Sequence, residues 1–250
     1  IFHIYQDSKG VIWIATDGYG LYFVDKRDGV IQHITHNPAD PFSLPNNQPS
    51  QVLEGRDGVF WIASYNKGIN KLPTSKSFFG HYYHQPGNEN TMSAKIAQSV
   101  LEDSKKRIWI GTDGGGLNLF DEKRNAFEHF RADPHDPTSL SSDKILYVLE
   151  SHDGNLWVCT WDGGLNKFFP SQKKAVQYKY NPSNPYSIGQ NTVWCAVEDS
   201  QHRLWLGTQT SGLNFLDPHT QRFYRFTHHQ GDSTSILSNF VFSIFIDSKN

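Results

Sequence analysis

Carboxylates and imidazoles, the side chains most often used for acid–base chemistry and metal binding, recur at regular intervals in this sequence. Glutamates lie 48 residues apart at Glu54, Glu102, Glu150 and Glu198, and histidines share a second phase at His33, His81 and His129. A residue found at the same place in successive copies of a repeat is most simply structural. We therefore predict that the glutamates make structural hydrogen bonds and that the histidines lie on an outer rim, without catalysis or metal binding.

Other histidines fall outside that phase. His152 and His202 lie in short turns, and His135 stands alone in a polar connector. By phase, the two turn histidines lie on the face opposite the variable loops described below, so no catalytic set converges on one face. The sequence thus predicts no catalytic residue, no cofactor and no metal site.

Two cysteines, Cys159 and Cys195, are too few for a disulfide scaffold and too irregularly placed for a zinc site. We expect two buried free thiols that pack as small hydrophobic side chains. A disulfide between neighbouring repeats stays open as an alternative in an oxidising compartment.

The elements that position these residues are copies of one repeating unit. Tryptophans recur every 48 residues without insertion or deletion, at Trp13, Trp61, Trp109, Trp157 and Trp205. Glycines keep the same interval at Gly20, Gly68, Gly116, Gly164 and Gly212. Hydroxyl residues keep it at Ser43, Thr91, Ser139, Ser187 and Ser235. Three residue types that hold one period across five copies identify a repeat protein.

Each copy has the pattern of four short strands. In the third copy, β-branched and aromatic runs at 100–103, 108–112, 117–120 and 127–130 are separated by clusters of turn-forming residues. A four-stranded sheet of about 48 residues can bury both faces only by packing between neighbours around an axis. We predict an all-β fold, a β-propeller of four-stranded antiparallel blades with the repeated tryptophans wedged between adjacent blades.

Two glycine-rich positions predict special backbone geometry. The last corner of the turn before each tryptophan is occupied by Gly10, Gly58, Lys106, Gly154, His202 and Asn250. Three glycines and one asparagine there predict a positive φ in a tight hairpin. The glycine column that begins at Gly20 predicts a left-handed corner or a close backbone approach.

Composition excludes two classes of partner. The chain has 250 residues, a formal net charge of −2, and 7 Trp, 17 Phe and 11 Tyr. Its aromatic content is sufficient for a sizeable core. No run of Lys and Arg is long enough to follow a phosphate backbone, so we expect no nucleic acid partner. No apolar run approaches the roughly 20 residues of a membrane span, and we see no signal peptide, so we expect no direct membrane insertion of this region.

The two ends of the chain share one phase of the repeat. Residues 1–10 and 241–250 are separated by five repeats, so both are expected to take the same strand and turn position. We expect residues 1–250 to form one propeller domain of five blades plus one extra strand, cut at both ends from a larger ring, most simply one of seven blades.

We expect the ligand-binding residues to lie where the copies of the repeat differ from one another, on one face of the propeller. The loops between the second and third strands vary: Asp17-Gly18-Tyr19, Tyr65-Asn66-Lys67, Asp113-Gly114-Gly115, Trp161-Asp162-Gly163 and Gln209-Thr210-Ser211. Aromatic plates beside hydrogen-bonding side chains suit a sugar or another flat polar ligand, although blade-specific packing is the alternative for each residue. The candidate ligand-binding residues are Tyr19, Tyr65, Lys67, Arg131, Trp161, Asp162, Lys179 and Trp194.

The third copy resembles a known repeat. Val100-Leu101-Glu102-Asp103-Ser104, followed by Ile108-Trp109-Ile110-Gly111-Thr112-Asp113-Gly114-Gly115-Gly116-Leu117, is similar to the two-component regulator propeller repeat. The copies at 7–21, 149–165 and 199–213 match nearly as well, whereas the copy around Trp61 departs most. The resemblance implies a periplasmic sensor region of a membrane-anchored regulator, which feeds a histidine kinase or similar output domain and often binds oligosaccharides.

From this resemblance we expect an extracytoplasmic ligand-sensing propeller of a bacterial two-component signalling protein. Its expected partners are an oligosaccharide or another small polar ligand on one loop face, the rest of the parent sensor chain and, as an open alternative, a second copy in a homodimer. A protein-interaction ring that uses the same aromatic loops is a second hypothesis. A lyase-type propeller enzyme is a third, and it requires a His, Glu or Asp set that breaks the repeat and converges on one face.

Overall fold

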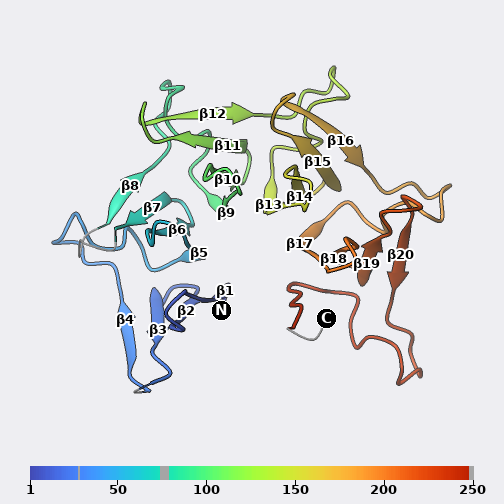
Figure 1. The fold of residues 1–250 in the computed structure, drawn as a ribbon, viewed down its shortest axis with the longest axis horizontal. Coiled ribbons are helices and arrows are strands. Elements are labelled where there is room, and N and C mark those ends of the chain that lie inside the picture. The colour runs from blue at the N-terminus through green and yellow to red at the C-terminus, as the bar shows by residue number, and fades with distance from the viewer. Residues whose placement is uncertain (28, 74–78, 248–250) are drawn as a thin grey trace. The chain divides into compact units, whose positions relative to one another are not determined.

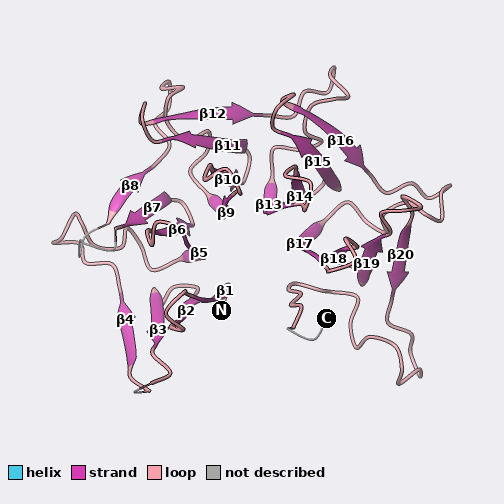
Figure 2. Cartoon of the chain, in the orientation of Figure 1, coloured by secondary structure: helices cyan, strands magenta, loops and turns pink. Residues whose placement is uncertain are grey.

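The computed structural model of the chain describes residues 1–27, 29–73 and 79–247, and their regular structure consists of β-strands alone (Figure 2). These strands form five sheets, each made of four consecutive strands in chain order (Figure 1). The expected propeller of four-stranded antiparallel blades is therefore confirmed. In the described part of the chain, no helix has the length and apolarity to cross a membrane.

Every blade uses the same up-and-down order, so each strand pairs with the next one along the chain. The strands are β1 (His3–Gln6), β2 (Ile12–Ala15), β3 (Leu21–Val24), β4 (Ile31–Ile34), β5 (Pro49–Glu54), β6 (Phe60–Ser64), β7 (Gly68–Leu72), β8 (Gly80–Tyr82), β9 (Ala97–Glu102), β10 (Ile108–Thr112), β11 (Gly116–Asp121), β12 (Ala126–Phe130), β13 (Ile145–Glu150), β14 (Leu156–Thr160), β15 (Leu165–Phe169), β16 (Lys174–Tyr178), β17 (Val193–Glu198), β18 (Leu204–Thr208), β19 (Leu213–Leu216) and β20 (Phe223–Phe226).

The hairpin before the repeated tryptophan is built around an aspartate in three blades. Asp103 accepts the backbone N–H groups of Lys105 and Arg107, both at 2.9 Å, and its second oxygen accepts the Trp109 indole N–H at 2.8 Å. The same indole bond joins Trp13 to Asp7 and Trp205 to Asp199. One carboxylate thus fixes both the turn and the tryptophan ring. The predicted positive φ is confirmed at the described corners: Gly10, Gly58, Lys106, Gly154 and His202. Asn250 lies outside the described residues.

The second glycine column meets both of its predicted requirements. Gly68 has a φ of 68°, and a Cβ atom placed on it would lie 2.1 Å from the Tyr82 carbonyl oxygen of the fourth strand. A side chain is therefore excluded both by backbone conformation and by close approach. Gly20, Gly164 and Gly212 have the same two features.

The repeated hydroxyl residue closes the connector between blades. Ser139 Oγ accepts the backbone N–H of Asp133 at 2.9 Å, six residues earlier. The other four copies make the same bond within 0.1 Å of that length, through Ser43, Thr91, Ser187 and Ser235. The residue that follows enters the core, as buried Met92 and Leu140 show. The connector is therefore a fixed loop between strands, and it holds the next blade in place.

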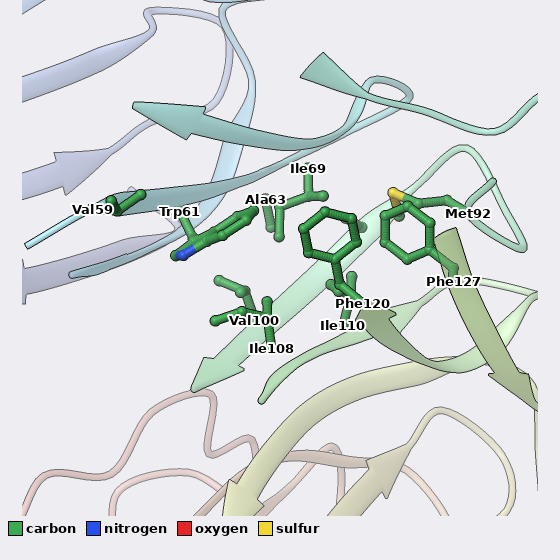
Figure 3. Packing of buried hydrophobic residues seen from close by; sticks show 11 residues of the cluster. Val59, Trp61, Ala63, Ile69, Met92, Val100, Ile108, Ile110, Phe120 and Phe127 are labelled. Atoms are coloured by element: carbon green, nitrogen blue, oxygen red, sulfur yellow. The ribbon is translucent and has the colours of Figure 1, made fainter. Parts of the chain in front are cut away.

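Hydrophobic cores lie between neighbouring blades within each of two compact units, Ile1–His129 and the part of the chain that begins at Phe130. In the first unit, Trp61 of the second blade packs with Val100, Ile108 and Phe120 of the third (Figure 3). In the second unit, Trp157 packs with β17–β20 residues such as Leu204 and Leu206. The predicted wedge role of the repeated tryptophan is confirmed at these two positions.

The cysteines and the C-terminal segment complete the second unit. Cys159 and Cys195 are buried free thiols, as expected. The extra strand expected from residue 241 is not assigned between 241 and 247. Val241 donates its N–H to the Thr208 carbonyl at 2.9 Å, but a strand requires a continuous ladder, and this segment lacks one in the described residues. The remaining residues of the expected terminal turn, 248–250, lie outside those described.

Candidate functional site

The loop face of the second unit brings two of the predicted tryptophans together. Trp161 directly follows β14 and is 38% exposed, and Trp194 lies near the start of β17. Their ring centroids are 5.2 Å apart and their planes are perpendicular, the edge-to-face geometry that aromatic pairs favour. The Thr192 hydroxyl donates to the Trp161 carbonyl oxygen and so fixes the loop to the neighbouring blade.

Two phenylalanines extend this pair into an aromatic cluster. Phe242 lies 5.1 Å and Phe240 lies 6.0 Å from the Trp194 ring centroid, and both are substantially exposed. Neither phenylalanine is among the predicted site residues. The signal was present, because Trp194 and Phe242 occupy one repeat column in which earlier copies carry Ser50, Gln98 and Leu146. We call Trp161, Trp194, Phe240 and Phe242 the aromatic cluster.

A polar pair stands next to Trp161. Asp162 accepts the Ser142 hydroxyl at 2.5 Å and the Lys144 ammonium at 3.1 Å. The Ser142 hydrogen bond and the charge of Lys144 lower the pKa of Asp162, which is therefore ionised at neutral pH. Both side chains of the ion pair remain about half exposed, so they can still bind a polar ligand. The predicted role of Asp162 in ligand binding stays a prediction, and Lys144 is a neighbouring residue that the sequence prediction did not include.

Arg131 and Lys179 are exposed just after the fourth strands β12 and β16. No hydrogen bond or ion pair among the described residues joins either of them to Trp161 or Asp162. Their predicted role in ligand binding therefore stays a prediction.

The first unit holds the remaining candidates, Tyr19, Tyr65 and Lys67. Tyr19 is 71% exposed on its loop, and Tyr65 is 40% exposed on the next one. Lys67 lines a cavity of about 400 Å³ with Pro45, Asn66, His81, Tyr83, His84 and Lys95. Burial lowers the pKa of His81 below its ordinary value, and the lining includes two lysines, Lys67 and Lys95. The cavity is thus a basic pocket, and Tyr19 and Tyr65 are not part of its lining.

On the opposite face of the blades, three of the repeated glutamates, Glu54, Glu102 and Glu198, make structural hydrogen bonds, as predicted. Glu54 accepts the Ser8 backbone N–H at 2.6 Å, and Glu102 accepts the Arg56 backbone N–H at 2.6 Å. Each glutamate therefore binds the hairpin turn of the preceding blade, a contact that we call the glutamate clasp. Glu198 accepts the Ser151 hydroxyl at 2.9 Å in the same way.

The rim histidines are also held by backbone contacts. His81 contacts the Pro41 carbonyl oxygen at 3.0 Å, and His129 contacts the Thr91 carbonyl oxygen at 2.8 Å. In the second unit, Gln177 and Arg225 occupy the same column and donate to the Ser139 and Ser187 carbonyl oxygens. This column therefore joins the fourth strand of a blade to the preceding connector, which supports a structural role for its histidines.

The fold is similar to several solved propellers. One is the extracellular domain of a protein described as a hybrid two component system from B. thetaiotaomicron, with a TM-score of 0.80 and 20% identity over 98% of this chain and 30% of that chain. Another is PorZ, a surface component of the type-IX secretion system of Porphyromonas gingivalis, with a TM-score of 0.70 and 16% identity over 96% and 35% of the two chains. A gluconolactonase from Xanthomonas campestris has a TM-score of 0.56 and 13% identity over 82% and 68%.

At these identities the structural likeness shows the fold alone. The chain spans about a third of the length of the first solved structures that it matches, with shares of 30%, 36% and 37%. No curated protein sequence matches it at a significant level.

A family model provides the sequence evidence. The model described as "Two component regulator propeller" matches residues 1–18, 92–114, 139–162 and 187–210. These stretches cover the hairpin and second strand of four blades. The second copy, around Trp61, is not matched, and it is also the copy that departs most from the repeat pattern. Four of the five repeats of this chain are thus similar to the two component regulator propeller repeat.

Proposed function

We propose that this chain is a ligand-sensing propeller from the extracytoplasmic part of a bacterial two-component signalling protein. We further propose that its ligand is an oligosaccharide or another small polar molecule bound at the loop face of the second unit. The observation that carries the proposal is the aromatic cluster beside the Asp162–Lys144 ion pair. The family match supports the signalling context.

The cluster has the chemistry that sugar binding requires. A sugar ring presents an apolar face that packs on an indole and hydroxyl groups that need hydrogen-bond partners. Trp161 supplies an exposed indole, and the half-exposed carboxylate and ammonium beside it can accept and donate such bonds. Trp161 begins a short loop between paired strands, so little conformational entropy is lost when a ligand binds there.

The same reasoning supports a non-catalytic role for the propeller. Glu54, Glu102 and Glu198 are occupied in glutamate clasps, and Asp7, Asp103 and Asp199 bind their tryptophans. Carboxylates that hold backbone turns are not available as general acids or bases. We expect the purified chain to have no hydrolase, lyase or kinase activity, and the fold likeness to a gluconolactonase carries no catalytic residue to this chain.

A protein-interaction surface is the second candidate. Phe240 and Phe242 are about 50% and 41% exposed beside Trp194, and exposed aromatic groups of this kind also serve as anchors for protein partners. The partner would bury the cluster without needing the Asp162–Lys144 pair. This difference makes the two candidates separable.

The test is isothermal titration calorimetry of the purified chain with a panel of neutral, acidic and sulfated oligosaccharides. The sensor proposal predicts saturable binding of at least one class, with a weaker affinity in Asp162→Asn because a polar contact is lost. If no oligosaccharide binds, the carbohydrate assignment is wrong. If a glycan binds and Asp162→Asn has no effect, the ligand does not use the proposed face.

A further inference from the structure

The hairpin turns of the fourth and fifth blades bring two histidines and a glutamate together within the second unit. His152 lies in the β13–β14 turn, His202 lies in the β17–β18 turn, and Glu198 ends β17. His202 Nδ1 is 3.3 Å from Glu198 Oε1, and His152 Nδ1 contacts the same oxygen. The ligand atoms of the three residues all lie within 4.8 Å of one another.

This convergence follows from the glutamate clasp and two repeat-breaking residues. The clasp brings the glutamate of one blade to the turn of the preceding blade, as at Ser8 and Arg56. In the column of His152 the other copies carry Ser8, Arg56, Ser104 and Ser200, and in the column of His202 they carry Gly10, Gly58, Lys106 and Gly154. Here alone among the described turns, both histidines flank one glutamate.

The backbone of His202 has a strained conformation. His202 has a φ of 60°. Glycine adopts this left-handed conformation without strain, whereas it costs other residues about 1–2 kcal/mol. The two imidazole rings are also stacked, with centroids 3.8 Å apart and an interplanar angle of 23°. Two imidazoles directed at one carboxylate oxygen form an arrangement in which a cation can bind between them.

We propose that His152, Glu198 and His202 form a binding site for a divalent transition metal, with zinc as the preferred ion. Imidazole nitrogen and carboxylate oxygen are common zinc ligands, and three protein ligands with one open position are a frequent arrangement. The ligand set contains no thiolate and only one carboxylate, which favours zinc over the oxygen-binding ions calcium and magnesium. The proposal is an alternative to the sequence prediction that the chain has no metal site.

The surroundings fit such a site. Ser151 donates its hydroxyl to the second oxygen of Glu198 at 2.9 Å, which orients the carboxylate while its first oxygen faces the histidines. The Glu198 side chain is 10% exposed, whereas those of His152 and His202 are 46% and 53% exposed. The imidazoles can therefore rotate to metal–nitrogen distances of about 2.0–2.1 Å, and solvent can fill the open position.

Bound zinc would link the turns of two neighbouring blades. The clasp alone joins them through hydrogen bonds to Glu198. A shared metal adds one coordination bond to His152 of the fourth blade and two to Glu198 and His202 of the fifth. Because the metal binds the folded chain and not the separated turns, zinc is expected to raise the melting temperature in a concentration-dependent way.

The experiment uses the untagged chain, freed of metal by a chelator and dialysed. Zinc is titrated by calorimetry, and cobalt(II), whose visible absorption reports its ligands, is titrated in parallel. The test variant is His152→Ser/His202→Gly, which restores residue types that other copies of the repeat carry, so the turns are expected to fold. His135→Ser, in an exposed connector of the same unit, is the matched control.

We expect one zinc ion per chain and a higher melting temperature with zinc in the parent and in His135→Ser. The double variant should lose zinc affinity by more than about 100-fold, because removing two ligands costs more than removing a group that orients one ligand. Its melting temperature in chelator should equal or exceed that of the parent. Equal zinc binding by the double variant and the parent, or no stoichiometric binding by the parent, would overturn the site and leave the histidines as hydrogen-bond donors to Glu198.

Discussion

Two tryptophan environments in this chain differ in almost every physical respect. Trp109 recurs in every blade, is 1% exposed, and donates its indole N–H to Asp103 inside the hairpin. Trp161 breaks its repeat column, is 38% exposed, and contacts Trp194 at the edge of the second unit. Repetition therefore marks the residues that build a blade, and departure from the repeat marks the residues that are free to bind something else.

The difference extends to the groups around each ring. The Asp103 carboxylate accepts hydrogen bonds from two backbone N–H groups of the hairpin and from the Trp109 indole. These donors therefore have partners within the hairpin itself. The neighbour of Trp161, Trp194, has a buried indole N–H without a partner among the described residues. An unpaired buried donor costs about 1–3 kcal/mol, so packing rather than hydrogen bonding holds Trp194 in the aromatic cluster.

The largest expected effect is on Trp109. Trp109→Ala should reduce the free energy of unfolding by about 3–5 kcal/mol, because it opens a cavity and leaves Asp103 without its indole donor. Trp161→Ala should reduce it by only about 0.5–1.5 kcal/mol, the contribution of one edge-to-face aromatic contact. Urea denaturation of both variants measures the contrast. Equal losses would mean that Trp161 is a packing residue like Trp109.

A second prediction separates backbone conformation from close approach. Gly68 and Gly18 both have positive φ, but a Cβ atom on Gly68 would meet the Tyr82 carbonyl oxygen, whereas nothing lies within 4 Å of one on Gly18. Gly18→Ala should therefore cost about 1–2 kcal/mol from the backbone term alone. Gly68→Ala should cost clearly more, because the fourth strand must move. Thermal melts of the two variants test this. Similar losses of stability would show that the fourth strand can move at no measurable cost in free energy.

The smallest expected effect is a dependence of stability on acid pH. Burial by itself raises the pKa of Asp199, but the hydrogen bonds from Trp205 and Arg203 outweigh burial and leave the pKa below its ordinary value. A carboxyl whose folded pKa is lowered stabilises the fold above its unfolded pKa of about 3.9, and this contribution is lost as the pH falls through the folded value. Asp199→Asn should flatten the stability profile below about pH 4. An unchanged slope there would exclude Asp199 as a source of acid sensitivity.

Much of the fold was predictable because the repeat is regular. The spacing of Trp13 to Trp205 predicted five blades, and the glycine columns predicted positive φ at the positions where the structure has it. The prediction of β10 as 108–112 was correct at both ends. Residues 241–247 were harder, because sequence phase shows where a strand belongs but not whether a partner ladder forms.

The site was less predictable, because contacts between blades join residues from different columns. Trp161 and Trp194 were both singled out, but their edge-to-face contact depends on how two blades pack. Phe242 shares a repeat column with Trp194, whereas nothing in the sequence connects Lys144 to Trp161. The same limit applied to His152 and His202, which are 50 residues apart and come together because the clasp of Glu198 joins the turns of neighbouring blades.

The most direct test of the central claim is a paired titration with an oligosaccharide that binds the parent chain. Trp161→Ala is compared with Tyr224→Ala, since Tyr224 is also 38% exposed but lies on β20, away from the loops. We expect Trp161→Ala to weaken binding by about 1–3 kcal/mol, the usual loss for an interface aromatic group, and Tyr224→Ala to leave the affinity unchanged. Equal affinities for the parent and Trp161→Ala, or a loss in Tyr224→Ala alone, would contradict the assignment of ligand binding to the repeat-breaking loops.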